Sequence, residues 1–348
     1  MDFIQLVKEG VANHASDIHL AANNRPAYRI NGAMHFLDIP SLTTDDVTGM
    51  ISQCLTHEKY EEFIATGDMD AAADIPGCGR FRINAFRQSR GATLVLRIIN
   101  AATPEIAELC LPQSIGRILE LKEGLVLVTG PTGSGKSTTL AAIINEYNKT
   151  RSSHIITIED PIEYLHDPKN CIVNQREVGT DSASYARALK AALREDPDII
   201  LVGEMRDLES IAIAITAAET GHLVLSTLHT IGASKTIDRL IDVFPPEQQQ
   251  QIRSQLSLVL KSVISQRLLP TADHKGRVAA FEMMFVNSAI SNLIREGRTA
   301  NINQAIQTGM NQGMITLDKS IAELLRRGVI APKTAAEYGA APNSLGHD

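Results

Sequence analysis

The stretch LVLVTGPTGSGKSTT, residues 125–139, carries the clearest structural pattern in this chain. It matches GxxxxGK[ST] at Gly130, Gly135, Lys136 and Ser137. The match follows a four-residue apolar strand and directly precedes a helix-forming segment, which is the context that indicates a P-loop. A glycine-rich turn that matched by chance would need strand, motif and helix to fall in register by accident. We therefore predict a phosphate-binding loop at this place.

The residue types of this loop suit nucleotide binding. Glycines let backbone N–H groups turn inward around phosphates, and the following helix points the positive end of its dipole at them. In such loops the lysine reaches the β- and γ-phosphates and the serine hydroxyl sits on Mg²⁺, so we expect ATP and Mg²⁺ as cofactors. The predicted nucleotide-binding residues are Gly130, Thr132, Gly133, Ser134, Gly135, Lys136, Ser137 and Thr138.

On both sides of the loop, short apolar runs alternate with helical segments. The runs HIITIED, DIILVGE and HLVLSTLH are separated by segments such as SYARALKAALRE and DLESIAIAITAAETG. This alternation predicts a mostly parallel sheet with helices on its faces. From about Pro246 we expect helices, interrupted by a strand at VAAFEMMFV, and then a loose tail.

Residues 1–100 have a different pattern, of mixed helix and strand. An amphipathic helix, a hairpin at Asn31-Gly32, a polar helix over about 43–65 and two strands separated at 88–91 predict a small α+β domain. The proline-containing stretch that follows has no sustained period and is typical of a linker.

The composition limits the possible functions. The 348 residues carry a formal net charge of -7, and aromatic residues make up 4% with no tryptophan. These values argue against wholesale duplex binding and against a stacking platform for single strands, so we expect no nucleic-acid partner. The four cysteines, Cys54, Cys78, Cys110 and Cys171, form no CxxC pair, which disfavours zinc. Without a signal peptide or an apolar run of about 18–20 residues, we expect a cytoplasmic chain that meets a membrane only through a partner.

Carboxylates and histidines stand at the ends of the apolar runs. DIILVGE ends in Glu204, with Gly203 where an aspartate is usual. Alone, such acids are more often solvated loop residues, but beside a P-loop they are candidates to hold Mg²⁺ or polarise water. A histidine there could bond a phosphate, or it could be a satisfied structural residue. The candidate catalytic residues on these strands are Glu159, Glu163, Glu204, His222 and His229, and the candidate metal ligands are Ser137 and Glu204.

The segment RFRINAFRQSRGATLVLRII, residues 80–99, is unusually basic for an acidic chain. It contains no Asp or Glu and holds Arg80, Arg82, Arg87, Arg90 and Arg97. Period two places Arg80 and Arg82 on one strand face, and Arg97 can face them from the adjoining strand. The pattern predicts an anionic group nearby, although a solvated face or an ion pair is the alternative.

GPTGSGKST, IEDPIE, VGEMRD and TGHLVLSTLHT, in this order, resemble the Walker A, Asp, Walker B and His boxes of the secretion ATPase superfamily. The chain is most similar to the type IV pilus retraction ATPases, from SDIHL to ITLDKSIAELL. The resemblance implies a PAS-like N-terminal domain, a RecA-like core and six subunits in a ring. It also implies that ATP hydrolysis extracts pilin through an inner-membrane platform protein, on the inner face of the cytoplasmic membrane. Arg82 and Arg97 match the arginines that the family places at a neighbour's nucleotide.

The resemblance leaves alternatives open. Pilus assembly and type II secretion ATPases generally carry a longer N-terminal region and a four-cysteine zinc module, which favours retraction here. Ser291, in AISNLIRE, departs from the arginine usual in the retraction family, and we expect Arg295 and Arg298 to share its helix face. A nucleotide-gated scaffold for another pilus motor is a further alternative. The expected divisions are an N-terminal domain at 1–100, a linker at 101–112, an ATPase core at 113–275, a helical C-terminal region at 276–330 and a disordered tail at 331–348.

Overall fold

The computed structural model describes residues 2–30, 32–99, 103–205, 207–273 and 275–339. The chain divides into two compact units, each with its own hydrophobic core. The first unit comprises residues 1–102 and 163–165, and the second comprises residues 103–162 and 166–348. The expected boundary between the N-terminal domain and the linker, at residue 100, lies close to this division.

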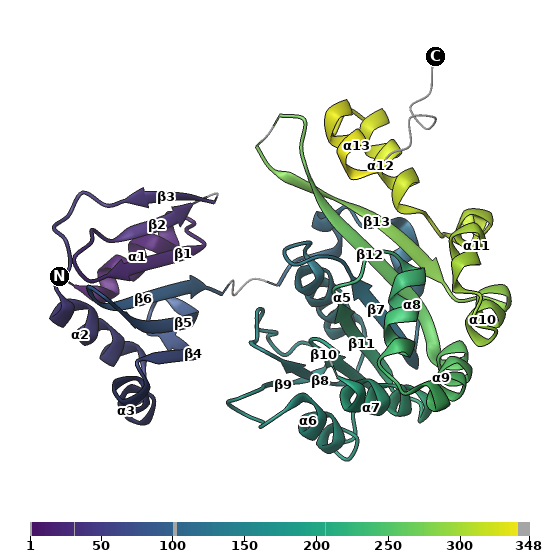
Figure 1. The fold of residues 1–348 in the computed structure, drawn as a ribbon, viewed down its shortest axis with the longest axis horizontal. Coiled ribbons are helices and arrows are strands. Elements are labelled where there is room, and N and C mark those ends of the chain that lie inside the picture. The colour runs from purple at the N-terminus through teal and green to yellow at the C-terminus, as the bar shows by residue number, and fades with distance from the viewer. Residues whose placement is uncertain (1, 31, 100–102, 206, 274, 340–348) are drawn as a thin grey trace. The chain divides into compact units, whose positions relative to one another are not determined.

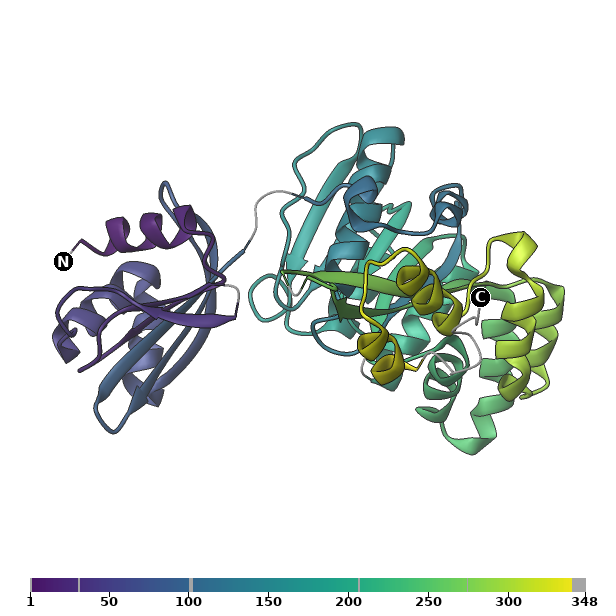
Figure 2. The same ribbon diagram turned by 90° about the horizontal axis from the view of Figure 1, so that it is seen from above.

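The first unit is an antiparallel sheet with three helices. Its strand order is β3-β2-β1-β6-β5-β4, and Figure 2 shows the helices on one face of the sheet. The buried side chains of β5 recur with period two, at Phe81, Ile83 and Ala85, because only one strand face meets the core. The strands are β1 Asp17–Ala21, β2 Ala27–Ile30, β3 Ala33–Phe36, β4 Asp68–Ile75, β5 Gly79–Gln88 and β6 Gly91–Ile98, and the helices are α1 Phe3–Ala12, α2 Thr44–Cys54 and α3 His57–Thr66.

The structure corrects two details of this unit. The single polar helix expected near residues 43–65 is two helices, because Thr56 interrupts the pattern and its hydroxyl caps α3 by accepting a bond from Lys59 N. Strand β4 was not predicted, since its sequence DMDAAADI contains only one β-branched residue, Ile75, among aspartates and alanines that are rare in strands. The hairpin β2–β3 is confirmed by its antiparallel pairing, while Asn31 of its turn lies outside the described residues.

The second unit is built on a seven-stranded sheet in the order β13-β12-β7-β11-β10-β8-β9. All neighbours are parallel except β12 and β13, which confirms the predicted α/β pattern. Every residue of the central strands β7, β10 and β11 is buried, which explains their continuous apolar sequence. The strands are β7 Gly124–Thr129, β8 His154–Glu159, β9 Ile172–Glu177, β10 Ile199–Val202, β11 Leu223–Leu228, β12 Leu260–Pro270 and β13 Arg277–Phe285.

Helices connect these strands and cover the sheet (Figure 1). Of the helices between residues 103 and 339, none is long and apolar enough to cross a membrane. Those of the core are α4 Gly116–Leu119, α5 Lys136–Thr150, α6 Tyr185–Ala192, α7 Leu208–Glu219, α8 Ala233–Asp242 and α9 Pro246–Val259. Those that follow the last strand are α10 Ser288–Arg295, α11 Ile302–Thr308, α12 Leu317–Arg326 and α13 Pro332–Tyr338.

The C-terminal part differs from the expectation in two places. Strand β12 occupies a segment that was expected to be helical, and it lies between β7 and β13, pairing with both. Helix α13 lies inside the expected tail, where Ala335 is buried with Leu269 and Ile330. Apolar contacts thus order the chain up to residue 339. The rest of the expected tail, and the linker positions 101–102, lie outside the described residues.

Candidate nucleotide-binding site

The phosphate loop predicted from sequence connects β7 to α5. Gly130 ends the strand at φ 145°, and a Cβ there would lie 2.2 Å from the Gln266 carbonyl oxygen, so only glycine fits. Gly135 caps α5 in the left-handed region, at φ 88°. The Lys136 ammonium donates to the carbonyl oxygens of Gly130 at 3.0 Å and Pro131 at 3.2 Å. The lysine charge is therefore held within the curve of the loop.

Gln266 on β12 fixes the shape of this loop. Its side-chain amide donates to the Ser134 carbonyl oxygen at 2.5 Å, and its side-chain oxygen accepts from the Thr139 hydroxyl at 2.9 Å. The glutamine is 2% exposed, so these bonds form away from water. The sequence analysis missed this residue, because it lies more than 120 positions from either partner and in a segment that was expected to be helical.

The ends of β10 and β11 bring Glu204 and His229 to the phosphate loop. Because β7, β11 and β10 are parallel neighbours, their carboxyl ends share one edge of the sheet. Glu204 Oε1 lies 3.1 Å from His229 Nε2, and His229 Nδ1 lies 3.4 Å from the Thr132 hydroxyl oxygen. One polar chain therefore links the loop, the β11 end and the β10 end.

A cavity of about 440 Å³ opens beside this polar chain. Its lining includes Arg239 of α8, a cationic residue that the sequence analysis did not select. The periodic helix pattern KTIDRLIDVF could have drawn attention to it, since the apolar residues of α8 are buried on one face and leave Arg239 on another. The cavity residues are Glu204, Met205, Ile211, Leu228, His229, Thr230, Arg239 and Val243.

The structure explains why Gly203 precedes Glu204. A Cβ at this position would lie 3.1 Å from Tyr185 Oη, 3.2 Å from the Ile158 carbonyl oxygen and 3.3 Å from Glu159 Cα. These distances are shorter than ordinary van der Waals contacts. The carboxylate usual at this position therefore has no room unless β8 and α6 move.

Glu159 lies at the same edge of the sheet, at the end of β8. Its Oε1 accepts hydrogen bonds from the Thr157 hydroxyl at 2.6 Å and from the Gln175 amide at 3.3 Å. Glu163 is exposed and belongs to the first unit in the division of the chain. The two acids of the predicted Asp box are therefore held differently, with the position of Glu159 fixed by neighbours in the sheet.

Arg82 and Arg97 face each other across β5 and β6 of the first unit, as period two predicted. Arg97 Nε donates to Asp17 Oδ1 at 2.8 Å, and Arg82 Nε lies 3.7 Å from Asp70 Oδ1. Burial opposes ionisation of Asp17, but hydrogen bonds from Ser16 and Arg97 outweigh it and hold the pKa of Asp17 below its usual value. Both arginines thus pair with carboxylates of their own unit while their side chains remain about half exposed.

His222 lies at the opposite edge of the sheet from the phosphate loop. Its carbonyl oxygen accepts a bond from Gly124 N, at the start of β7, and its ring bonds Ala217 and Thr220 at the end of α7. At about 3.3 Å per residue, β11 separates it from His229 by roughly 20 Å. The structure therefore corrects the expectation that both histidines lie beside a nucleotide, because the His222 ring forms hydrogen bonds with groups at the C-terminal end of α7.

The segment after His229 is fastened to the strand pair β12–β13. Gly232 N donates to the Ser265 hydroxyl at 2.9 Å, and Ala233 N donates to Glu282 Oε1 at 2.7 Å. Burial raises the pKa of Glu282, although bonds from the backbone of Ala233 and Leu317 partly offset it. One carboxylate thus holds the first turns of α8 and α12.

The residues of the loop suit a bound nucleotide and Mg²⁺. The Ser134 hydroxyl is buried and has no hydrogen-bond partner within the described ranges. Helix α5 begins directly after the loop, at Lys136, so the positive end of its dipole lies at the loop. No cluster of three or more metal-binding His, Cys, Asp or Glu side chains occurs in the part of the chain that the structure describes.

A parallel sheet that ends in a glycine-rich loop, a lysine and a helix start defines a P-loop nucleotide-binding protein. A family model described as Type II/IV secretion system protein matches residues 2–331. The chain belongs to this family.

Proteins with similar sequences match most or nearly all of this chain. The type IV pilus retraction ATPase PilT of Pseudomonas aeruginosa is 48% identical over 345 residues, which cover 99% of this chain and 100% of that protein. A twitching motility protein of Neisseria gonorrhoeae is 48% identical over 310 residues, or 89% of this chain and 83% of that protein. The crystal structure of the pilus retraction motor PilT with bound ADP superposes with a TM-score of 0.92 at 46% identity, covering 99% of each chain.

Proposed function

We propose that this ATPase drives type IV pilus retraction, removing pilin from the fibre and thereby producing twitching motility. The observation that carries the proposal is the polar chain Thr132–His229–Glu204 at the phosphate loop, in a protein that matches a retraction ATPase over its full length. The proposed assembly is a homohexamer on the inner face of the cytoplasmic membrane, which acts on the fibre through an inner-membrane platform protein.

Lys136 and Ser137 bind the nucleotide in this proposal. Lys136 lies inside the loop and neutralises the β- and γ-phosphates, while Ser137, in the first turn of α5, holds Mg²⁺ together with Glu204. Mg²⁺ supplies neutralisation of phosphate charge when it is bound. The protein thus contributes chiefly the positions of charged and hydrogen-bonding groups, which is what phosphoryl transfer requires.

Glu204, Glu159 and Glu163 are the proposed acids that orient the attacking water. Glu204 is the strongest of them because it is already hydrogen-bonded to His229 near the loop. His229 can respond to the state of the nucleotide, since its Nδ1 lies next to the Thr132 hydroxyl in the phosphate loop. Loss of the γ-phosphate would change the contacts of this polar chain and release the β11 end.

Arg82 and Arg97 are proposed to act on the nucleotide of an adjacent subunit. Arginines that stabilise the transition state in this way contribute about 10³-fold or more to the rate. For Arg97 this requires exchange of its bond to Asp17 for a bond to phosphate, which its exposed position permits. In the resting subunit the ion pairs would hold both side chains ready.

Helix α10 is the proposed surface that couples hydrolysis to retraction. As predicted, Asn287 caps it by accepting a bond from Ile290 N, and Gly297 follows its end at φ 70°. Ser291 was expected to share an exposed helix face with Arg295. Its hydroxyl instead donates to the Ser257 carbonyl oxygen of α9. The serine therefore fastens α10 to α9, and Arg295 remains exposed for a partner.

The proposal is tested with purified protein and with a strain that lacks its retraction ATPase. The wild type should hydrolyse ATP and restore twitching, whereas Lys136→Ala should do neither, because the charge on the transferring phosphoryl group is lost. Lys333→Ala, at an exposed position of α13, is the matched control and should behave as wild type.

Two results would contradict the proposal in different ways. If the wild-type protein hydrolyses ATP but does not restore twitching, it is an ATPase with a function other than pilus retraction. Absence of hydrolysis by a wild-type hexamer that binds ATP would instead identify a nucleotide-gated scaffold.

A further inference from the structure

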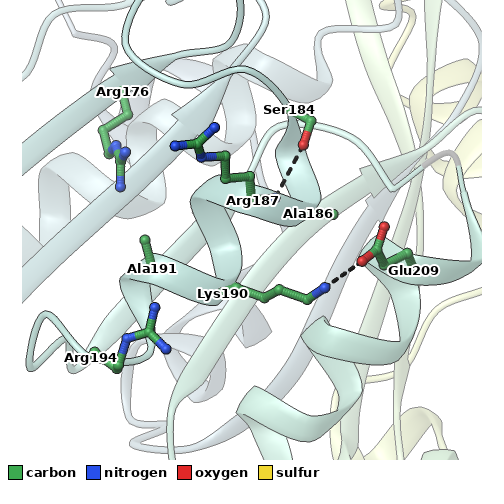
Figure 3. A pocket seen from close by; sticks show the side chains of 8 residues that line it. All are labelled: Arg176, Ser184, Ala186, Arg187, Lys190, Ala191, Arg194 and Glu209. Carbon is green, nitrogen blue, oxygen red and sulfur yellow. Dashed lines mark hydrogen bonds and ion pairs between the residues drawn. The ribbon is translucent and has the colours of Figure 1, made fainter.

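We propose that a basic pocket on α6 is a second anion site, for a small molecule that carries phosphate groups. The pocket has a volume of about 570 Å³, which is within the range of small-molecule sites, roughly 300–1,000 Å³. It is formed by β9, α6 and the start of α7. Its lining residues are Arg176, Ser184, Ala186, Arg187, Lys190, Ala191, Arg194 and Glu209 (Figure 3).

The charge of the pocket is opposite to that of the chain. Four of its eight lining residues are cationic and one is anionic, in a protein of net charge -7. Lys190 is paired with Glu209, and Arg176 Nη1 lies 3.1 Å from Glu195 Oε1. Arg187 and Arg194 make no ion pair within residues 103–205 or the other described ranges. Two arginine charges are therefore left without a counterion in the pocket.

Helix α6 and the turn that follows it carry three of these cations. Arg187 and Lys190 have the spacing i and i+3 on the helix, so both side chains leave it on one face, and Arg194 lies two residues past the helix end. The other face of α6 is buried, with Ala188, Leu189 and Ala192 in the core. In Figure 3, Arg176 and Arg187 extend toward the same region, whereas Lys190 turns away to Glu209. Guanidinium groups from a strand and a helix therefore line the same pocket, and of these two Arg176 already pairs with Glu195.

The side chains indicate the chemistry of the ligand. A planar guanidinium donates two parallel hydrogen bonds to the oxygens of a phosphate group. Several guanidinium groups together can therefore bind a ligand that carries more than one phosphate group. Like charges that line one pocket repel each other, and an anion bound there would attract all of them. A compact polyanion such as pyrophosphate satisfies both conditions.

The pocket is separate from the nucleotide site but structurally connected to it. None of its lining residues belongs to the phosphate loop. Helix α6 packs against β8, β10 and α7, and Tyr185, its first residue, meets Gly203 next to Glu204. A ligand in this pocket could therefore shift α6 and, through Tyr185, the end of β10. Binding of that ligand does not depend on the proposed function.

The test measures pyrophosphate binding by isothermal titration calorimetry on the full-length protein with saturating ADP, which occupies the phosphate loop. We expect one pyrophosphate site per subunit at physiological salt. The double variant Arg187→Ala, Arg194→Ala should weaken it at least about tenfold, because it removes two of the four cations. The matched control, Arg326→Ala with Arg327→Ala, removes the same charge from two exposed positions at the C-terminal end of α12 and should bind as wild type. ADP affinity should be unchanged in both variants.

Three outcomes would overturn the proposal. Equal loss of pyrophosphate binding in the control variant would mean that net charge, rather than the pocket, attracts the anion. Wild-type binding by the α6 variant would place the anion elsewhere. A changed oligomeric state of the α6 variant, with no pyrophosphate binding in the wild type, would make this face a contact between copies of the chain.

Discussion

Replacement of Gln266 by leucine is the sharpest test of the phosphate loop geometry. The substitution keeps the approximate volume and removes both bonds, from the glutamine amide to the Ser134 carbonyl and from the Thr139 hydroxyl to the glutamine oxygen. A buried group left without a partner costs about 1–3 kcal/mol. The Thr139 hydroxyl can rotate to another acceptor, whereas the Ser134 carbonyl is fixed by the loop. We therefore expect a loss of about 2 kcal/mol.

This loss can be measured in two ways. About 2 kcal/mol corresponds to a decrease in melting temperature of roughly 4–8 °C for a unit of this size, measured by calorimetry or circular dichroism. Because the loop N–H groups would no longer be held in position, ADP affinity should fall about tenfold or more, measured by titration calorimetry. Gln255→Leu is the matched control, since Gln255 bonds Glu219 at 2.9 Å on the exposed surface of α9.

The reasoning would be refuted by an unchanged ADP affinity in a Gln266→Leu variant that melts at the wild-type temperature. A lower melting temperature with unchanged affinity would restrict Gln266 to fold stability. Equal effects of both leucine variants would show that glutamine bonds in general, rather than this buried one, matter to the protein.

Four further predictions concern other parts of the molecule. Gly203→Ala should slow hydrolysis about tenfold or more with little change in ADP affinity, as its methyl group displaces the β10 end, and steady-state kinetics would show this. The pKa of Glu282 is raised above its ordinary value of 4.5, so its folded form retains a proton that the unfolded chain loses, and its contribution to stability falls as pH rises through that interval. The unfolding free energy of the wild type, measured relative to that of Glu282→Gln, should therefore fall as pH rises above 4.5, and a constant difference in urea titrations would contradict it. Arg295→Glu should preserve hydrolysis but stop twitching, whereas normal twitching would exclude the exposed α10 face as a coupling surface. Mixed rings of Arg97→Ala and Lys136→Ala chains should recover some hydrolysis, and assembled mixed rings without activity would place the arginine within its own subunit.

The sequence alone determined the features that depend on neighbouring residues. The phosphate loop could be predicted because its glycines, Lys136 and the start of α5 are contiguous, so that local backbone geometry carries the pattern. The buried strands were also visible, since strands covered on both faces require continuous apolar runs. Caps such as Asn287 and stops such as Gly297 follow the same local rules.

The tertiary structure alone decided which distant residues meet. Gln266 reaches the loop only because β12 lies beside β7, and no local pattern in SQRLLP specifies that neighbour. His222 and His229 flank one strand in the sequence, and the parallel pairing of β11 with β7 decides that His229, rather than His222, lies at the edge of the phosphate loop. The basic face of α6 likewise becomes a pocket only where β9 and α7 border it. Strand order and direction result from packing the whole apolar core, which no short segment encodes by itself.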